Sequence, residues 1–176
     1  MASRQLLSRV STLEQSIRQA SGVRYSTVFG IVAADGRLVR SRKEVGGEWI
    51  ETSEVPEAYI SEALEPALLS TKRFVIIIGG RGSQKSVGAH NIVLAKVRDK
   101  GIKALCMREY QESIADSVHS LLEEEIGRLN MSGFEVQEKA IYSDSGGEIK
   151  YRGLSRNPSS VKSAHGFGVF CCEESD

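Results

Sequence analysis

The chain has 176 residues, enough for one domain with a hydrophobic core, or for one domain and a small appendage. Its composition is 40% apolar and 26% charged with a formal net charge of zero, which is typical of a soluble globular protein and gives no global electrostatic reason to bind nucleic acid. No apolar run approaches the ~20 residues of a membrane helix and no signal peptide is visible, so we expect a cytoplasmic protein with no membrane contact.

Residues 1–55 are predicted to form an N-terminal extension. Leu6, Val10, Leu13 and Ile17 recur at spacings of four and three residues, which predicts an amphipathic helix over residues 3–20. A coiled-coil contact between chains is the alternative for this stripe. Residues 23–52 are predicted to form a small β-meander, because β-prone runs alternate with turn signals.

Residues 56–176 are predicted to form a second domain of the α/β class. Residues 59–69 are expected to be helical, with a restart at Pro66, and residues 74–78 to form a strand buried on both faces. Helices are then expected over 85–100 and 113–129, and strands over 102–107, 134–136, 140–142, 148–151 and 166–172. This order predicts a mostly parallel central sheet flanked by helices, the architecture of P-loop NTPases.

The junction of the 74–78 run with the next helix carries the clearest chemical signal. A buried strand followed by a glycine-rich loop and then by Lys-Ser at a helix start is the layout of a phosphate-binding P-loop. The candidate nucleotide-binding residues are Gly79, Gly80, Arg81, Gly82, Ser83, Gln84, Lys85 and Ser86. We expect backbone N–H groups and Lys85 to face phosphates and Ser86 to offer an oxygen to Mg²⁺, so ATP and Mg²⁺ are the expected cofactors.

One residue departs from the usual G-x-x-x-x-G-K-[ST] pattern. Gln84 stands where the second glycine belongs, and a side chain there limits the backbone and crowds the phosphates. We therefore keep open that the chain is a catalytically silent interaction module, or another kind of P-loop NTPase.

Two adjacent acids follow the last predicted strand. In P-loop sites one such carboxylate holds hydrated Mg²⁺ and the other orients the attacking water. Glu173 is predicted to be the metal-side acid and Glu174 the catalytic base, with a solvated acidic terminus as the alternative. Arg81 is either an arginine that stabilises charge on the γ-phosphate or a solvated loop residue. Arg108 and Glu109 are expected at the ligand-binding edge of the sheet, where they form an ion pair or, as the alternative, couple to nucleotide.

The remaining ionisable residues give weaker signals. Cys106, Cys171 and Cys172 are predicted to be buried thiols in a reducing compartment. The three histidines, which are His90, His119 and His165, are scattered and are expected at surface or helix positions. We expect no structural metal site, since no Cys or His pair has ligand spacing.

Taken in order, these motifs resemble the ATPase domain of the large terminase subunits of tailed bacteriophages. The resemblance is to the branch whose loop reads Gly-Gly-Arg-Gly-Ser-Gly-Lys-Ser, which residues 79–86 match except at Gln84. Further similar segments are residues 104–109, 113–118, 148–154 and 161–163, together with the pair Glu173 and Glu174. The resemblance spans about residues 57–176, and residues 1–55 carry no recognised match.

The resemblance implies an ATP-hydrolysing motor that moves double-stranded viral DNA into an empty procapsid. It implies that Arg81 is the loop arginine of the family, and that the partners are DNA, the portal protein, a small terminase subunit and further copies in a ring. It also implies a location in the host cytoplasm, docked on the portal during packaging. Family domains continue beyond the paired acids, so we expect the ATPase domain to be incomplete at its C-terminus.

Overall fold

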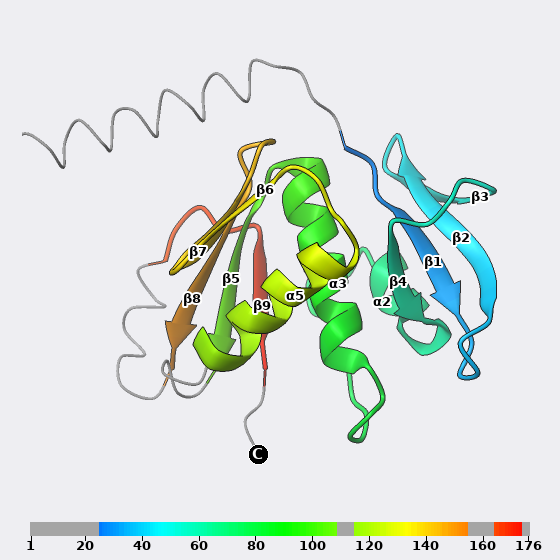
Figure 1. Ribbon diagram of the computed structural model, residues 1–176, viewed down its shortest axis with the longest axis horizontal. Coiled ribbons are helices and arrows are strands. Elements are labelled where there is room, and N and C mark those ends of the chain that lie inside the picture. Colours follow the sequence, from blue (N-terminus) through cyan, green and yellow to red (C-terminus); the bar gives the residue numbers. More distant parts are fainter. Residues whose placement is uncertain (1–24, 109–114, 155–163, 174–176) are drawn as a thin grey trace, which may run out of the picture.

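The structure is a computed structural model that describes residues 25–108, 115–154 and 164–173. The predicted helix over residues 3–20 and the segments 109–114, 155–163 and 174–176 lie outside the described residues. The chain is a mixed α/β protein in which helix α3 (Lys85–Lys100) lies between two sheets (Figure 1). Among the described residues, no helix has the length and apolar character needed to cross a bilayer.

The first sheet contains the predicted meander and one additional strand. Strands β1 (Val28–Val32), β2 (Leu38–Val45) and β3 (Glu48–Thr52) pair antiparallel, which confirms the meander. Strand β4 (Ala58–Ser61) pairs parallel with β1 and completes the order β3-β2-β1-β4. The predicted boundary after residue 55 therefore falls inside this sheet.

The helix predicted over residues 59–69 is only partly correct. Residues 58–61 form β4, and the helical part consists of the 3-10 turn η1 (Glu62–Leu64) and helix α2 (Glu65–Leu69), with Pro66 in the first turn. Ala58 and Ile60 are buried, while Tyr59 between them is exposed. This alternation of buried and exposed residues is typical of a strand with one face on the core. The helix prediction around Pro66 was extended over these residues, so the strand was not predicted.

The second sheet has the order β6-β7-β8-β5-β9. Its strands are β5 (Lys103–Arg108), β6 (Phe134–Gln137), β7 (Ala140–Ser143), β8 (Glu148–Gly153) and β9 (Val169–Cys172). Strand β5 pairs parallel with β8 and β9, whereas β6–β7 and β7–β8 are antiparallel. The expectation of a mostly parallel sheet is wrong, because the hairpin β6–β7 joins the sheet beside β8.

The prediction of a buried strand over residues 74–78 is also wrong. These residues form no strand and are largely exposed, with Phe74 at 78%, Ile76 at 84% and Ile78 at 91% of their full accessibility. Both neighbours of β5 are already occupied, by β8 and β9, and the other edge of β9 pairs with no described strand. The segment instead lies along α2, where Ile77 packs against the core of the first sheet.

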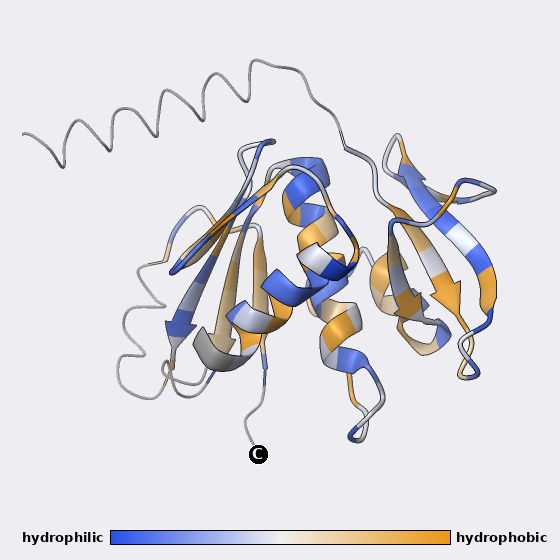
Figure 2. Ribbon diagram, viewed as in Figure 1, coloured by the Kyte–Doolittle hydropathy of each residue, from blue (hydrophilic) through white to orange (hydrophobic). Residues whose placement is uncertain are grey.

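Helix α3 closes two hydrophobic cores at once, and apolar residues colour it and the strands on both of its sides (Figure 2). Val93, Leu94 and Val97 pack in the core of the second sheet. Ile92 and Ala95 pack in the core of the first sheet. The helix therefore carries apolar residues around most of its circumference, as expected for a buried helix.

A second helical segment covers the same face of the second sheet as α3. It begins with the π-helical turn η2 (Ala115–His119) and continues as α5 (Ser120–Arg128). Val118 and Leu122 are buried in the core with Cys106, Ile149 and other strand residues. The helix predicted over 113–129 is thus confirmed in position for the described residues.

Polar contacts fix the first sheet to α3. Arg98 is 1% exposed and donates hydrogen bonds to Glu57 (2.7 Å) and to Thr27 (2.9 Å). The backbone N–H of Thr27 donates to Asp99 (2.6 Å). A buried guanidinium needs such partners to offset its loss of hydration, so these bonds specify how the sheet sits on the helix.

Candidate functional site

The predicted phosphate loop connects the exposed 74–78 segment to α3. The backbone N–H of Ser83 bonds to the carbonyl of Gly80 (3.3 Å), and the N–H of Gly88 bonds to the carbonyl of Gln84 (2.9 Å). Helix α3 therefore begins immediately after the loop, as the sequence predicts. Its first turn holds no acidic side chain, so the partial positive charge of the helix N-terminus is not neutralised locally.

Gln84 adopts the left-handed conformation, with φ 56° and ψ 17°, at the residue that precedes the helix. Glycine occupies this backbone region at little cost, whereas other L-residues pay about 1–2 kcal/mol. The structure thus gives a conformational reason why the usual pattern has glycine at this position. Gln84 is exposed, so its side chain projects into the solvent on the loop side.

Lys85 lies back along the beginning of the loop. A methyl group built on Gly79 would come within 3.8 Å of Lys85 Cδ and within 2.7 Å of Ser83 Oγ. Gly79 is therefore required for the close approach of these side chains to the backbone. Ser86 is half-buried in the first turn of α3, and Arg81 is exposed at the tip of the loop.

The acidic half of the predicted site comes from the end of β9. The backbone N–H of Glu173 donates to the carbonyl of Met107 (3.0 Å), which extends the pairing of β9 with β5. Its side chain places Oε2 3.4 Å from Arg108 Nε and Oε1 4.0 Å from His90 Nε2. Glu174, the predicted base, lies outside the described residues.

The contact with His90 joins the two halves of the site. His90 lies on α3 five residues after Lys85, so Glu173 lies beside the beginning of this helix. The loop before α3 and the carboxyl ends of β5 and β9 occupy the same end of the molecule (Figure 1). The structure therefore places the loop and Glu173 at the same end of the molecule, with His90 as the residue of α3 that contacts Glu173.

Two residues at this edge were not among the predicted binding or catalytic residues, although Arg108 was expected at the ligand-binding edge. His90 was expected at a surface or helix position, and it is helical but only 1% exposed. Its spacing of four residues from Ser86, which puts both on one helix face, is the signal that would have found it. Arg108 pairs with Glu173, whereas the partner expected from the sequence, Glu109, lies outside the described residues.

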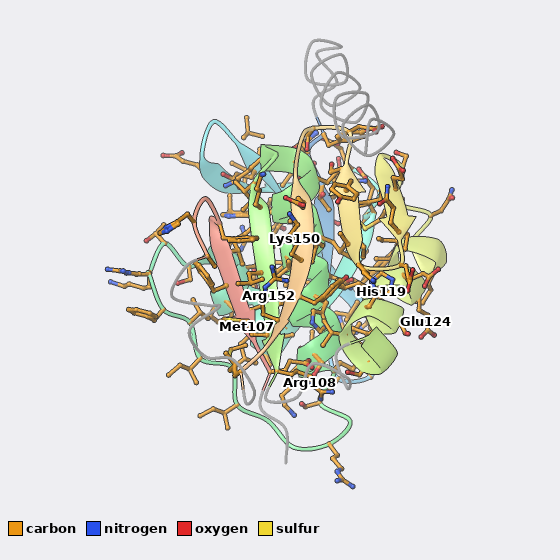
Figure 3. All side chains as sticks on the ribbon, turned by 90° about the vertical axis from the view of Figure 1, so that its left-hand side faces the viewer. Met107, Arg108, His119, Glu124, Lys150 and Arg152 are labelled. Atoms are coloured by element: carbon orange, nitrogen blue, oxygen red, sulfur yellow. The ribbon has the colours of Figure 1, made fainter. Side chains whose placement is uncertain are left out.

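Arg108 also links the site to the second helical segment. It lies at the end of β5 (Figure 3), and its Nη1 donates to Ser117 Oγ (2.6 Å) in η2. Arg108 is partly buried and its Nε has no hydrogen-bond partner among the described residues. One guanidinium thus contacts both Glu173 and η2.

The cysteines differ from the prediction in burial. Cys106 is buried, Cys171 is half-buried, and Cys172 is exposed, so the expectation of three buried thiols is wrong for Cys172. Cys106 and Cys171 are paired across β5 and β9. The hydrogen bond from the Cys106 thiol lowers the pKa of Cys171, and His90 acts in the same direction against the effect of burial. The same bond and burial raise the pKa of Cys106.

The comparisons with known proteins agree with the motif order. The family model described as phage terminase large subunit matches residues 71–176. A comparison with curated proteins finds no match. The matched range contains the loop, α3, the second sheet and Glu173, and it covers more than half of the chain.

Proposed function

The chain belongs to the phage terminase large subunit family, which acts in phage DNA packaging, and we propose that it is a piece of the ATP-driven motor of that machinery. The observation that supports the proposal is the contact of 4.0 Å between Glu173 and His90, which lies on α3 five residues after Lys85 and so relates the acid at the end of β9 to the helix that follows the loop. Ligands bind at the carboxyl ends of strands in open α/β sheets, and this edge is such a place.

The residues at this edge fit a magnesium nucleotide. Ser86 and Glu173 offer the hydroxyl and carboxylate oxygens that Mg²⁺ prefers, and a methyl group built on Gly80 or Gly82 would meet nothing within 4 Å, so the loop backbone is uncovered at these two residues. Bound Mg²⁺ would neutralise charge that develops on the phosphates. Lys85 and the N–H groups at the start of α3 would bind phosphate, with Arg81 assigned to the γ-phosphate and Glu174 to the attacking water.

The proposed context follows from the family. The motor would act on double-stranded viral DNA in the host cytoplasm, docked on the portal of a procapsid as a ring of copies and together with a small terminase subunit. These partners are proposals that rest on family membership and not on a surface of this chain.

A binding experiment tests the nucleotide site. Isothermal titration of the chain with Mg²⁺ and a non-hydrolysable ATP analogue should give binding that Lys85→Ala weakens by about 10- to 100-fold, since a charge-assisted hydrogen bond contributes about 1.5–3 kcal/mol. Lys139→Ala, in the exposed turn between β6 and β7, is the matched control and should leave the affinity unchanged. Equal affinity of wild type and Lys85→Ala would count against the phosphate loop.

The second candidate function is a silent interaction module, and the left-handed Gln84 is the observation that favours it. Gln84→Gly distinguishes the two. A large gain in ATP affinity and hydrolysis in this variant indicates an enzyme impaired by one side chain. No detectable nucleotide binding in either form indicates that the fold serves assembly alone.

A further inference from the structure

We propose that Arg108 is a positioning residue that couples the Glu173 carboxylate to the π-helical turn η2. This proposal rests on the proposed function where it concerns nucleotide, whereas the bridge itself rests on two contacts of Arg108. Arg108 Nε lies 3.4 Å from Glu173 Oε2, and Arg108 Nη1 lies 2.6 Å from Ser117 Oγ. One planar group therefore spans the end of β9 and the start of the helical segment.

The geometry gives Arg108 a fixed place between its two partners. Arg108 is the last residue of β5, and its carbonyl accepts a hydrogen bond from the N–H of Leu154 (2.9 Å), which holds the backbone. Its side chain and that of Glu173 are 22% and 20% exposed, so water screens their attraction less than it would at the surface. A change in the charge of the Glu173 carboxylate therefore changes its attraction to the Arg108 guanidinium.

Three contacts of the described residues help to hold the turn η2 in place. Val118 is buried in the core, and His119 Nδ1 lies 2.9 Å from the Tyr151 hydroxyl. The bond from Arg108 to Ser117 is a further contact, and it leads to the candidate site. π-Helical turns are uncommon and often occur at functional sites, because their wider winding strains the helix. Loss of the Ser117 anchor should therefore loosen η2 first.

We expect the bridge to respond to a divalent cation, because the cation and Arg108 would compete for the Glu173 carboxylate. A divalent cation on Glu173 shares the carboxylate charge that otherwise attracts Arg108. Arg108 is then released from β9, and its bond to Ser117 loses one of the two contacts that orient the guanidinium. Occupancy at Glu173 is thus transmitted to η2 and to the start of α5.

The test is hydrogen exchange of peptides that cover residues 115–128, measured first without nucleotide. Glu173→Gln and Arg108→Gln should each speed exchange in residues 115–121 about fivefold, which corresponds to about 1 kcal/mol for one net hydrogen bond. The double variant should add nothing beyond the single ones, since both break the same bridge. Additive effects, or no change in Glu173→Gln, would overturn the proposal.

Two variants separate the bridge from general damage. Ser117→Ala removes the hydroxyl that accepts the bond from Arg108 Nη1 and should speed exchange in 115–121 without altering the fold seen by circular dichroism. Glu138→Gln removes an exposed carboxylate in the β6–β7 turn and should leave the segment unchanged. Equal acceleration by Glu138→Gln would show a nonspecific charge effect and overturn the proposal.

A second arm adds Mg²⁺ with a non-hydrolysable ATP analogue. Wild type should gain protection at residues 79–90 and exchange faster at 115–121, while Arg108→Gln should gain the protection without the further acceleration. Protection at 79–90 with no change at 115–121 overturns the coupling. No protection at 79–90 refutes the proposed nucleotide site instead, and the nucleotide-free double variant still decides on the bridge.

Discussion

Replacing Ile76 with alanine is expected to leave the stability of the protein almost unchanged. Ile76 is 84% exposed, so about one sixth of its side chain is buried. Full burial of such a side chain contributes about 1.5–3 kcal/mol, and one sixth of that is at most about 0.5 kcal/mol. The matched variant Ile31→Ala removes a side chain that is 0% exposed in the first sheet, and it should cost about 2–5 kcal/mol.

Urea denaturation followed by far-ultraviolet circular dichroism measures both variants. The slope of the transition should be the same for both and for wild type, so that a shift in midpoint reports stability alone. A loss of 2 kcal/mol or more in Ile76→Ala would refute the exposed position of residues 74–78. Such a result would instead place this segment in a core, as the sequence alone predicts.

Three further predictions concern other parts of the fold. Gly88→Ala should cost about 1–3 kcal/mol, because the new methyl group collides with the Leu64 side chain, and the double variant with Leu64→Ala should lose less than the sum of the single losses in urea denaturation. Gln84→Gly should raise the midpoint of thermal unfolding, because it removes the left-handed strain of about 1–2 kcal/mol. The greater freedom of glycine in the unfolded chain offsets about 0.4–1 kcal/mol of this gain. A lowered midpoint would contradict the prediction. The hydrogen bond from Arg40 holds the pKa of Glu65 below its ordinary value of 4.5, so ionised Glu65 stabilises the fold above that pH, and this contribution disappears as the pH falls through the folded-state pKa. The free energy of unfolding of Glu65→Gln should therefore fall less steeply than that of wild type below about pH 4.5. Parallel curves of unfolding free energy against pH would contradict the pairing.

The sequence predicted local elements well where one signal dominated. Helix α3 begins at Lys85 and ends at Lys100, as the loop before it and Gly101 after it indicate. Strands β5 and β8 follow from short apolar or alternating runs between turn residues. These features depend on neighbours in the chain, which the sequence contains directly.

The errors came from assuming which partners an element finds. Residues 74–78 have the composition of a buried strand, but composition does not supply a partner. Strand β5 is paired on both edges, and the segment does not pair with the outer edge of β9. Likewise the pairing of β4 with β1 joins segments separated by β2 and β3, which no local pattern reveals. Composition sets what a segment can bury, and tertiary pairing decides whether it does.

The candidate site was predicted in outline and missed in its connections. The sequence indicated the 79–86 loop and Glu173 by motif, and the structure places them at the same end of the molecule. The assigned roles of these residues stay predictions. His90 was missed, since its spacing of four residues from Ser86 is a weak signal by itself. Arg108 was expected at the ligand-binding edge, but its contact with Glu173 joins segments far apart in the chain, which no local pattern reveals.

The position of α3 between two sheets has a consequence for how the molecule comes apart. Because α3 contributes side chains to the hydrophobic cores of both sheets, removing either sheet would expose an apolar face of this helix to water. We infer that the two sheets unfold together with α3 as one cooperative unit. Proteolytic cleavage within residues 70–84 should therefore not release a separately folded fragment. A genetic split at that point should yield two insoluble pieces that recover structure only when they are refolded together.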